Sequence, residues 1–171
     1  MHTDLAKSSF LPWYGVRTKP NHEKVAATVL QNKGYEQYLP IYRSRRRWSD
    51  RVIEKDRPLF PGYVFCRFDA NYLMPIITTP CVVSVVRLGG GLAPIPNSEI
   101  ETIQAVLRSG LAPESCRFLY EGQKVRVNRG SLEGLEGLLL NQKNEWRLVI
   151  SVTMLQRSIS VEIDRESIEA I

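Results

Sequence analysis

The chain has 171 residues, of which 43% are hydrophobic and 24% are charged, and its net charge is +5. This composition is ordinary for a soluble globular protein of one or two domains that can bury a core. The N-terminal residues lack the apolar stretch of a signal peptide, and no run approaches about 18 apolar residues. We therefore expect a cytoplasmic protein without membrane contact.

The three cysteines exclude two further classes of protein. They are odd in number, widely spaced, and form no Cys-x-x-Cys pair: Cys66, Cys81 and Cys116. A disulfide framework needs paired cysteines, and a structural zinc site needs closely spaced ligands. We expect reduced structural thiols and neither a metal ion nor a cofactor.

The first predicted elements are a strand over 13–17 and a helix over 22–32. The helix is expected because apolar residues recur on one face at a spacing of about 3.6, namely Val25, Ala26, Val29 and Leu30. Asn21 is a candidate N-cap, and Gly34 is a candidate C-terminal stop. A strand leading into a helix is therefore predicted at the start of the fold.

The middle of the chain is predicted to alternate strands with short helices. Strands are expected over 35–42, 63–68 and 82–88, with a short helix over 71–77 that Pro75 weakens. The basic segment between the first two strands is either an extension of them or a hairpin. A glycine triplet ends the third strand.

A further helix is predicted from Ser98 to about Gly110. Ser98 and Glu101 are three residues apart, as in a capping box, and Ile103 and Leu107 lie on one apolar face. The resulting order of elements matches the split βαβ pattern of ferredoxin-like α+β domains. We expect an antiparallel sheet with helices on one side.

The C-terminal third is predicted to be all-β. Periodicity is lost over 111–117, which indicates a linker, and four strand candidates then follow at 124–127, 137–140, 147–152 and 159–163. About fifty residues of short strands predict a small barrel. The predicted organisation is a flexible N-terminus (1–10), a first domain (11–110), the linker, and a second domain (118–171).

The sequence offers little chemistry for catalysis. Its two histidines are His2, near the terminus, and His22, at a predicted helix start. Neither a Gly-x-Ser-x-Gly elbow nor a metal-ligand pattern is present, and the glycine triplet lacks the Gly-Lys-Ser/Thr ending of a phosphate loop. Because these signatures are missing, we predict that the protein is not an enzyme. An enzyme would need a pocket joining His22 to acidic residues.

Positive charge is concentrated in residues 43–57, which carry seven Lys or Arg, three Asp or Glu, and a net charge of +4. Such a concentration favours contact with a polyanion, and Arg suits phosphate because its planar fork donates two hydrogen bonds. The candidate nucleic-acid contacts are Arg43, Arg45, Arg46, Arg47, Trp48 and Arg51. The alternative is a solvated loop whose arginines pair with Asp50, Glu54 and Asp56.

An aromatic strand follows the basic segment. Core packing is the default role of a single aromatic residue, but six of them are too many for one small sheet to hide easily: Trp13, Tyr14, Phe60, Tyr63, Phe65 and Phe68. Some of them are expected to form an exposed apolar patch for protein binding. The region 118–171, by contrast, has a net charge of −1, which favours protein binding over general RNA binding.

The motifs together resemble the NusG family of transcription elongation factors. The residues that carry the resemblance are Trp13 and Tyr14, the strand of Phe60, Pro61, Gly62, Tyr63 and Val64, and Pro94, Ile95 and Pro96 before a helix. The stretches 122–130 and 134–137 are similar to the KOW motif of that family. The resemblance covers about 11–171 in the family's order of domains.

The resemblance implies an N-terminal domain that docks on the clamp of the largest RNA polymerase subunits. Its implied docking residues are Trp13, Tyr14, Phe60, Pro61, Gly62, Tyr63 and Phe65. The basic segment takes the place of the family's variable hairpin, beside upstream or non-template DNA. The implied factor is a monomer, associated with the nucleoid through polymerase, that favours processive elongation or antitermination. A ribosome- or RNA-binding KOW protein without polymerase contact is the alternative.

The second domain departs from the family at one loop. Housekeeping members contact a small-subunit ribosomal protein or the termination factor Rho through a loop that typically reads Ile-Phe-Gly-Arg. The matching residues here are Met154, Leu155, Gln156 and Arg157, so the aromatic residue and the glycine are missing. This difference argues against Rho binding. Together with the Arg-rich segment, it favours a specialised paralogue resembling the RfaH, LoaP or UpxY groups.

Overall fold

The computed structural model describes residues 11–118, 122–142 and 144–171, so the predicted flexible segment 1–10 lies outside it. The chain divides into two compact units. Unit 1 comprises Met1–Pro40 and Phe60–Asn97, and unit 2 comprises Ile41–Leu59 and Ser98–Ile171. Both are built on antiparallel sheets with few helices, which is the mixed α/β class that the sequence predicts.

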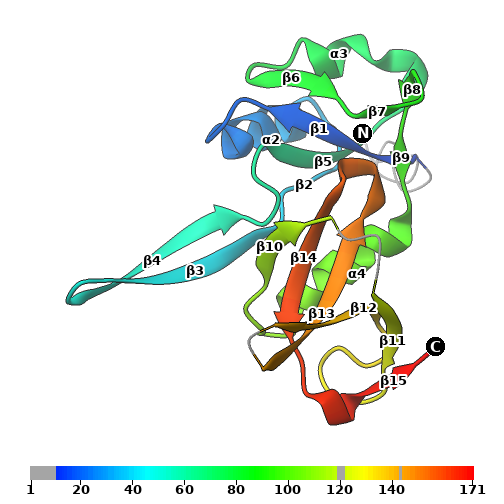
Figure 1. Cartoon of the computed structure of the whole chain (residues 1–171). Coiled ribbons are helices and arrows are strands. Elements are labelled where there is room, and N and C mark those ends of the chain that lie inside the picture. The colour runs from blue at the N-terminus through cyan, green and yellow to red at the C-terminus, as the bar shows by residue number, and fades with distance from the viewer. Residues whose placement is uncertain (1–10, 119–121, 143) are drawn as a thin grey trace. The chain divides into compact units, whose positions relative to one another are not determined.

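Unit 1 is built on an antiparallel sheet (Figure 1). Its strands are β1 (Trp13–Thr18), β2 (Gln37–Tyr38), β5 (Tyr63–Arg67), β6 (Val82–Val85) and β9 (Pro94–Ile95). The strand order is β2-β5-β1-β6, and β9 also pairs with β1. In the β1/β5 ladder Gly15 lies opposite Phe65, and Val16 lies opposite Val64. β1 and β5 are therefore interior strands, and their side chains are largely buried.

Helix α2 (Glu23–Asn32) packs on this sheet through Ala27 and Leu30, which belong to the same buried cluster as residues of β1 and β5. Gly34 ends the helix as predicted: its φ is +87°, and the Tyr35 N–H donates to the Leu30 carbonyl at 3.1 Å. The N-cap prediction is wrong. His22 occupies that position, and Asn21 has a left-handed φ of +63° in the preceding turn.

Two predicted elements of unit 1 are broken in the structure. The helix expected over 71–77 is a 3-10 turn (Ala70–Tyr72) followed by α3 (Met74–Ile77), with Pro75 in the first turn of α3. Proline fits there because the first N–H groups of a helix have no intrahelical partner. The strand expected over 82–88 is divided into β6 and β7 (Arg87–Leu88), and β7 pairs with β8 (Gly91–Leu92).

Unit 2 contains a long two-stranded hairpin of β3 (Ile41–Trp48) and β4 (Arg51–Pro58). Of the two predicted alternatives for the basic segment, the hairpin is therefore confirmed. The strand expected over 35–42 is interrupted at Leu39 and Pro40, because proline has no N–H to donate to a ladder. β2 and β3 consequently belong to different sheets.

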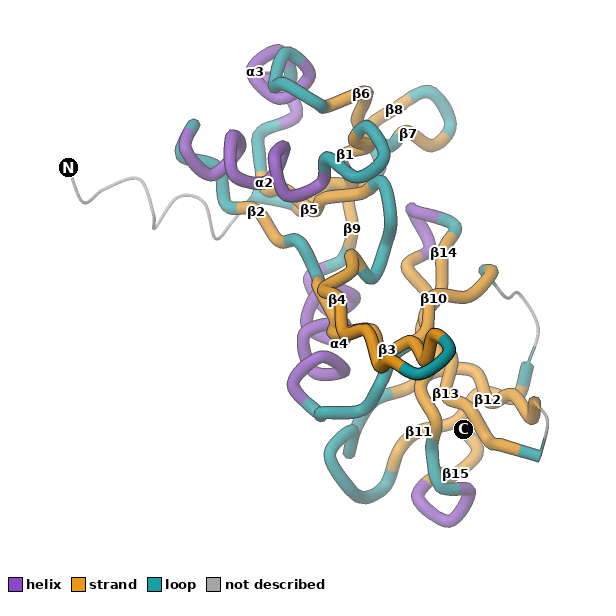
Figure 2. The backbone as a smooth tube through the Cα atoms, turned by 90° about the vertical axis from the view of Figure 1, so that its left-hand side faces the viewer, coloured by secondary structure: helices purple, strands orange, loops and turns teal. Residues whose placement is uncertain are grey.

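The remainder of unit 2 combines one helix with a six-stranded antiparallel sheet, drawn in orange in Figure 2. The strand order is β10-β14-β13-β12-β11-β15. The elements are α4 (Asn97–Arg108), β10 (Glu114–Arg117), β11 (Gln123–Val127), β12 (Glu136–Gln142), β13 (Glu145–Val152), β14 (Arg157–Glu162) and β15 (Ile168–Ala170), with 3-10 turns at Thr153–Leu155 and Arg165–Ser167. This sheet is compatible with the predicted small all-β domain.

The four predicted strands of this sheet are confirmed, and two more were not predicted. β10 lies inside the segment 111–117 that the sequence indicates as a linker, and it pairs with β14 through contacts such as Ser115 opposite Ile159. β15 closes the sheet against β11. Helix α4 begins at Asn97, so Ser98 lies inside the helix and is not its cap.

Candidate functional site

A rigid turn precedes β5 at the start of the predicted docking surface. We call Phe60, Pro61, Gly62 and Tyr63 the aromatic turn. The Tyr63 N–H donates to the Phe60 carbonyl at 3.1 Å, and Gly62 has a φ of +83°. Proline followed by a residue of positive φ is the arrangement that a type II turn requires.

The aromatic turn is held from behind by Glu23 of α2. The Glu23 side chain is 5% exposed, and its Oε1 accepts a hydrogen bond from the Gly62 N–H at 2.7 Å. The Gly62 carbonyl in turn accepts from the Thr18 N–H at 2.9 Å. The backbone N–H and carbonyl of Gly62 therefore both have hydrogen-bond partners within unit 1. Glu23 was not among the predicted site residues; the signal that could have identified it is a carboxylate in the first turn of a predicted helix next to the first strand.

Four of the seven predicted polymerase-binding residues lie in the core. The exposed fractions are 4% for Trp13, 5% for Tyr14, 1% for Phe60 and 0% for Phe65. Phe60 and Phe65 meet edge to face with their ring centroids 5.7 Å apart. Phe65 also stacks on Tyr38 with ring centroids 6.2 Å apart, whereas Tyr14 lies in the cluster that α2 covers on the other face of the sheet. These four residues therefore form no exposed patch, whereas Pro61 is exposed and Gly62 and Tyr63 are half-buried.

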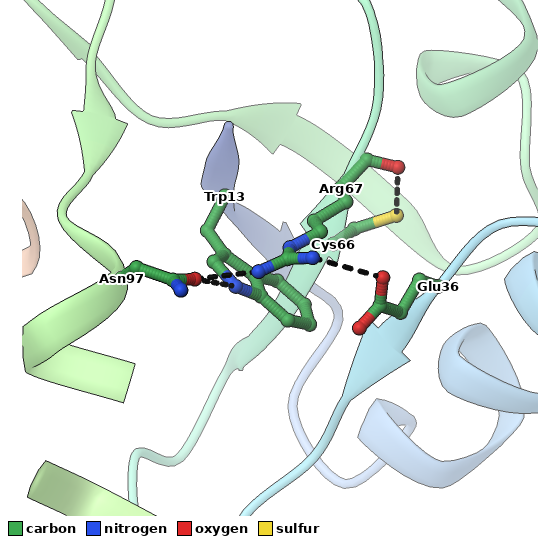
Figure 3. Close-up of polar contacts among 5 residues, drawn as sticks. All are labelled: Trp13, Glu36, Cys66, Arg67 and Asn97. Atoms are coloured by element: carbon green, nitrogen blue, oxygen red, sulfur yellow. Dashed lines mark hydrogen bonds and ion pairs between the residues drawn. The ribbon is translucent and has the colours of Figure 1, made fainter. Parts of the chain in front are cut away.

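Trp13 also takes part in a polar cluster, shown in Figure 3. Its Nε1 donates to the Asn97 Oδ1 at 3.0 Å, and the same oxygen accepts from Arg67 Nη2 at 2.5 Å. The Arg67 guanidinium lies 4.7 Å from the centre of the Trp13 ring and forms an ion pair with Glu36 at 3.3 Å. A buried cation is tolerated here because the ring, the amide and the carboxylate all face it.

Beside this cluster, Cys66 is a buried structural thiol, as predicted (Figure 3). Burial, and to a lesser extent the Glu36 carboxylate, raises the pKa of the Cys66 thiol to about 12. The thiol is therefore protonated at neutral pH, and a protonated thiol is a poor nucleophile.

The basic segment is a regular ladder in which β3 and β4 pair from Ile41 opposite Pro58 to Trp48 opposite Arg51. Ser49 in the tip has a φ of +50°, the sign that tight hairpin turns need. Two of the predicted nucleic-acid residues form ion pairs: Arg45 Nε lies 2.6 Å from Glu54, and Arg43 lies 3.6 Å from Glu54 and 3.8 Å from Asp56.

Of the other predicted nucleic-acid residues, the structure describes the side chains of two and not those of the other two. Arg47 and Arg51 are exposed, whereas the side chains of Arg46 and Trp48 lie outside the described part of the chain. Lys55 and Arg57 are also exposed on β4 and were not among the predicted site residues. Their alternation with acidic residues along β4 was the signal that could have identified them.

The loop that corresponds to the KOW partner site begins with the 3-10 turn at Thr153–Leu155. Leu155 is 5% exposed, Gln156 and Arg157 are exposed, and the Met154 side chain lies outside the described residues. Gln156 has a left-handed backbone (φ +52°, ψ +43°), and its Nε2 donates to the Thr153 carbonyl at 2.8 Å. Glutamine thus adopts the conformation that glycine accepts most readily.

His22 lies directly before helix α2, at its N-cap position. The side chain is exposed, and its Nδ1 lies 2.8 Å from the Pro20 carbonyl oxygen. Over the residues that the structure describes, no group of three or more His, Cys, Asp and Glu side chains is arranged to hold a metal ion. Within the same residues, no helix has the length and apolar character to span a membrane.

Comparison with known proteins defines the family. Residues 11–104 match the family described as "NusG: Transcription termination factor nusG". The chain is 27% identical over 180 residues to the transcription termination/antitermination protein NusG of Borreliella burgdorferi, covering 93% of this chain and 98% of that protein. It is 26% identical to the Lactococcus lactis protein of the same name over 172 residues, covering 93% and 92%.

A solved structure supports the fold. The structure described as "Domain interaction in Thermotoga maritima NusG" superimposes with a TM-score of 0.56 at 19% identity, covering 96% of this chain and 99% of that one. Because the family match extends over more than half of the sequence, the chain belongs to the NusG family.

Proposed function

We propose that this protein is a non-enzymatic transcription factor that binds RNA polymerase at the clamp of its largest subunits and promotes processive elongation or antitermination. The observation that carries the proposal is the family match over residues 11–104, together with relatives named transcription termination/antitermination proteins that align along almost their whole length. Binding alone suffices for such a role, because a ligand that prefers one clamp conformation shifts the population toward it. We assign the activity to the bacterial cytoplasm, at the nucleoid.

We assign residues 11–110 to a ferredoxin-like polymerase-binding domain and residues 118–171 to a KOW domain, joined by 111–117. The antiparallel sheet with α2 packed on it supports the first assignment, and the six-stranded antiparallel sheet supports the second. These domain boundaries are taken from the sequence motifs, whereas the boundaries of unit 1 and unit 2 are those of the two compact parts of the structure.

The proposed polymerase contact is the outer side of the aromatic turn, where Pro61, Gly62 and Tyr63 are accessible. Phe60 and Phe65 support this surface from the core, where their rings meet. Trp13 and Tyr14 lie toward the other end of β1, opposite Arg67 and Cys66, and we assign them to the stability of the sheet. A preformed turn favours binding because little conformational entropy remains to be lost on association.

Single-round transcription with the cognate polymerase tests the proposal. We expect the wild-type protein to increase read-through at a pause or terminator, and Tyr63→Ala to reduce that increase. Tyr72→Ala is the matched control, since Tyr72 is 70% exposed in the same unit and does not belong to the aromatic turn. Unchanged read-through at saturating wild-type protein contradicts the proposal. Co-purification with ribosomes but not polymerase supports the alternative KOW protein.

For the KOW domain, we propose a small-subunit ribosomal protein, and not Rho, as the partner of the loop at residues 154–157. The loop lacks the aromatic residue and the glycine of housekeeping members, and Leu155 is buried. These differences and the Arg-rich hairpin support a specialised paralogue. Pull-down of the full chain against purified Rho and small ribosomal subunits tests this, with retention of the ribosomal subunit alone as the expected result.

A further inference from the structure

We infer that the β3/β4 hairpin binds the phosphodiester backbone of duplex DNA through one of its two faces, the face that carries Arg51, Lys55 and Arg57. The inference rests on the proposed function, since a factor bound to transcribing polymerase acts close to DNA. It goes further by dividing the described basic residues of the hairpin between a face whose described side chains include no carboxylate and a face that also carries Glu54 and Asp56.

The division follows from the register of the ladder. Residues directly opposite each other in an antiparallel pair project from the same face, and successive residues alternate between faces. Arg43 lies opposite Asp56 and Arg45 lies opposite Glu54, so basic and acidic residues share one face. We call this the paired face; its described side chains between the strand ends are Arg43, Arg45, Arg47, Val52, Glu54 and Asp56.

The other face is composed differently. Tyr42 lies opposite Arg57, and Ser44 lies opposite Lys55. We call this the open face; its described side chains are Tyr42, Ser44, Arg51, Ile53, Lys55 and Arg57. These described side chains carry three positive charges and no carboxylate, and Arg46 occupies a further position on this face, whereas the paired face carries three positive and two negative charges. The hairpin is therefore electrostatically two-sided, although its sequence reads as one basic run.

The ion pairs agree with this division. Arg43 and Arg45 lie within 3.8 Å of Glu54 or Asp56. Among the ion pairs that connect described side chains, none includes Arg51, Lys55 or Arg57, and all three of these residues are exposed. A phosphate approaching the paired face would meet two carboxylates as well as the arginines. On the open face it would meet cations alone.

The geometry of the open face suits duplex DNA. The six-residue step from position 51 to position 57 spans about 20 Å of extended strand, at about 3.3 Å per residue. Duplex DNA carries one negative charge per about 1.7 Å of its axis, so three phosphates lie within reach of this length. The major groove also admits a two-stranded β-ribbon. Contacts of this kind hold the hairpin on the backbone without reading the base sequence.

Two triple variants of the full chain separate the faces. Arg51→Gln/Lys55→Gln/Arg57→Gln removes three positive charges from the open face and leaves Arg46, and Arg43→Gln/Arg45→Gln/Arg47→Gln removes three from the paired face. Both variants lower the net charge by three, so net charge is matched. The paired-face variant also leaves Glu54 and Asp56 unneutralised. If local charge alone governed binding, it would therefore lose at least as much affinity.

The measurement is the affinity for a fluorescent 20-base-pair DNA duplex between 50 and 200 mM salt. Each phosphate contact contributes about −0.9 to the log-log salt slope, so the open-face variant should flatten the slope by about 2 to 3. The paired-face variant should change it by less than about 1. If either triple variant fails to fold by circular dichroism, Lys55→Gln and Arg45→Gln give the same comparison, with an expected difference of about 0.9.

Three outcomes overturn the inference: equal changes of slope in the two variants, no duplex binding by the wild type at 50 mM salt, or tighter binding of a single-stranded RNA of equal length. Read-through by polymerase is measured on the same preparations. If the wild type raises read-through while both variants bind DNA alike, the one-faced contact is wrong and the proposed function stands. If the wild type binds DNA as expected but does not alter read-through, the proposed function fails instead.

Discussion

The aromatic turn and the hairpin are adjacent in sequence, yet they use their side chains in opposite ways. The aromatic turn is fixed by buried groups: Phe60 is 1% exposed, and the Glu23 carboxylate that holds Gly62 is 5% exposed. Every residue of β4 is exposed except Pro58, which is half-buried. The first region therefore contributes to stability and presents little surface, whereas the second presents much surface and contributes little stability. Three pairs of substitutions test this contrast.

The largest difference is expected for apolar truncation in the two regions. Phe65→Ala should lower the free energy of unfolding by about 3 to 5 kcal/mol, because it leaves a cavity in a fully buried site. Val52→Ala on the hairpin, where Val52 is 63% exposed, should change it by less than about 0.5 kcal/mol. Urea denaturation of the full chain measures both. A loss below 1 kcal/mol for Phe65→Ala would show that the aromatic residue is not core.

A smaller effect is expected from the backbone of the aromatic turn. Gly62→Ala should cost about 1 to 2 kcal/mol, since a Cβ is strained at a φ of +83° even though no atom lies within 4 Å of it. Gly91→Ala is the control, because Gly91 has the same open surroundings without a positive φ. Thermal unfolding of the two variants measures the difference. Equal midpoints would contradict the strained turn.

The smallest effect is expected when a glutamate is replaced by glutamine in each of the two regions. Glu23→Gln should cost about 1 kcal/mol or more, because a buried charge-assisted hydrogen bond to the Gly62 N–H becomes a neutral one. Glu54→Gln removes an acceptor of exposed ion pairs and should cost less than about 0.5 kcal/mol. The two values come from parallel urea titrations, and a larger loss for Glu54→Gln would reverse the contrast.

Local patterns in the sequence predicted most elements correctly. Helix α2, its end at Gly34 and four strands of unit 2 follow from periodicity and turn residues, and the hairpin was one of two alternatives for the basic segment. The misses have local causes. Asn21 was expected to cap α2, but its backbone is left-handed, and Pro40 divides one predicted strand into β2 and β3. β10 is short and polar, and only its pairing with β14 makes it a strand.

The candidate site residues were also predictable only in part from local patterns. The aromatic residues could be identified from the sequence, but the buried ones among them could not. Aromatic side chains such as those of Trp13 and Phe65 are typical both of a core and of a docking patch. Their burial depends on residues distant in the chain: Phe65 packs against Phe60 and Tyr38, and Trp13 packs against Arg67 and Asn97. Glu23 and Asn97 were missed because their partners, Gly62 and Arg67, lie 39 and 30 residues away in the chain.

The sequence by itself determined the family motifs, helix α2 and the concentration of charge in residues 43–57, since all of these depend on neighbours along the chain. Tertiary structure decided which aromatic residues are buried, which carboxylate holds the aromatic turn, and which arginines pair with acids. The last decision depends on register: in an antiparallel ladder, a shift of one residue exchanges the two faces. The basic run therefore becomes one paired face and one open face only when β3 and β4 are aligned.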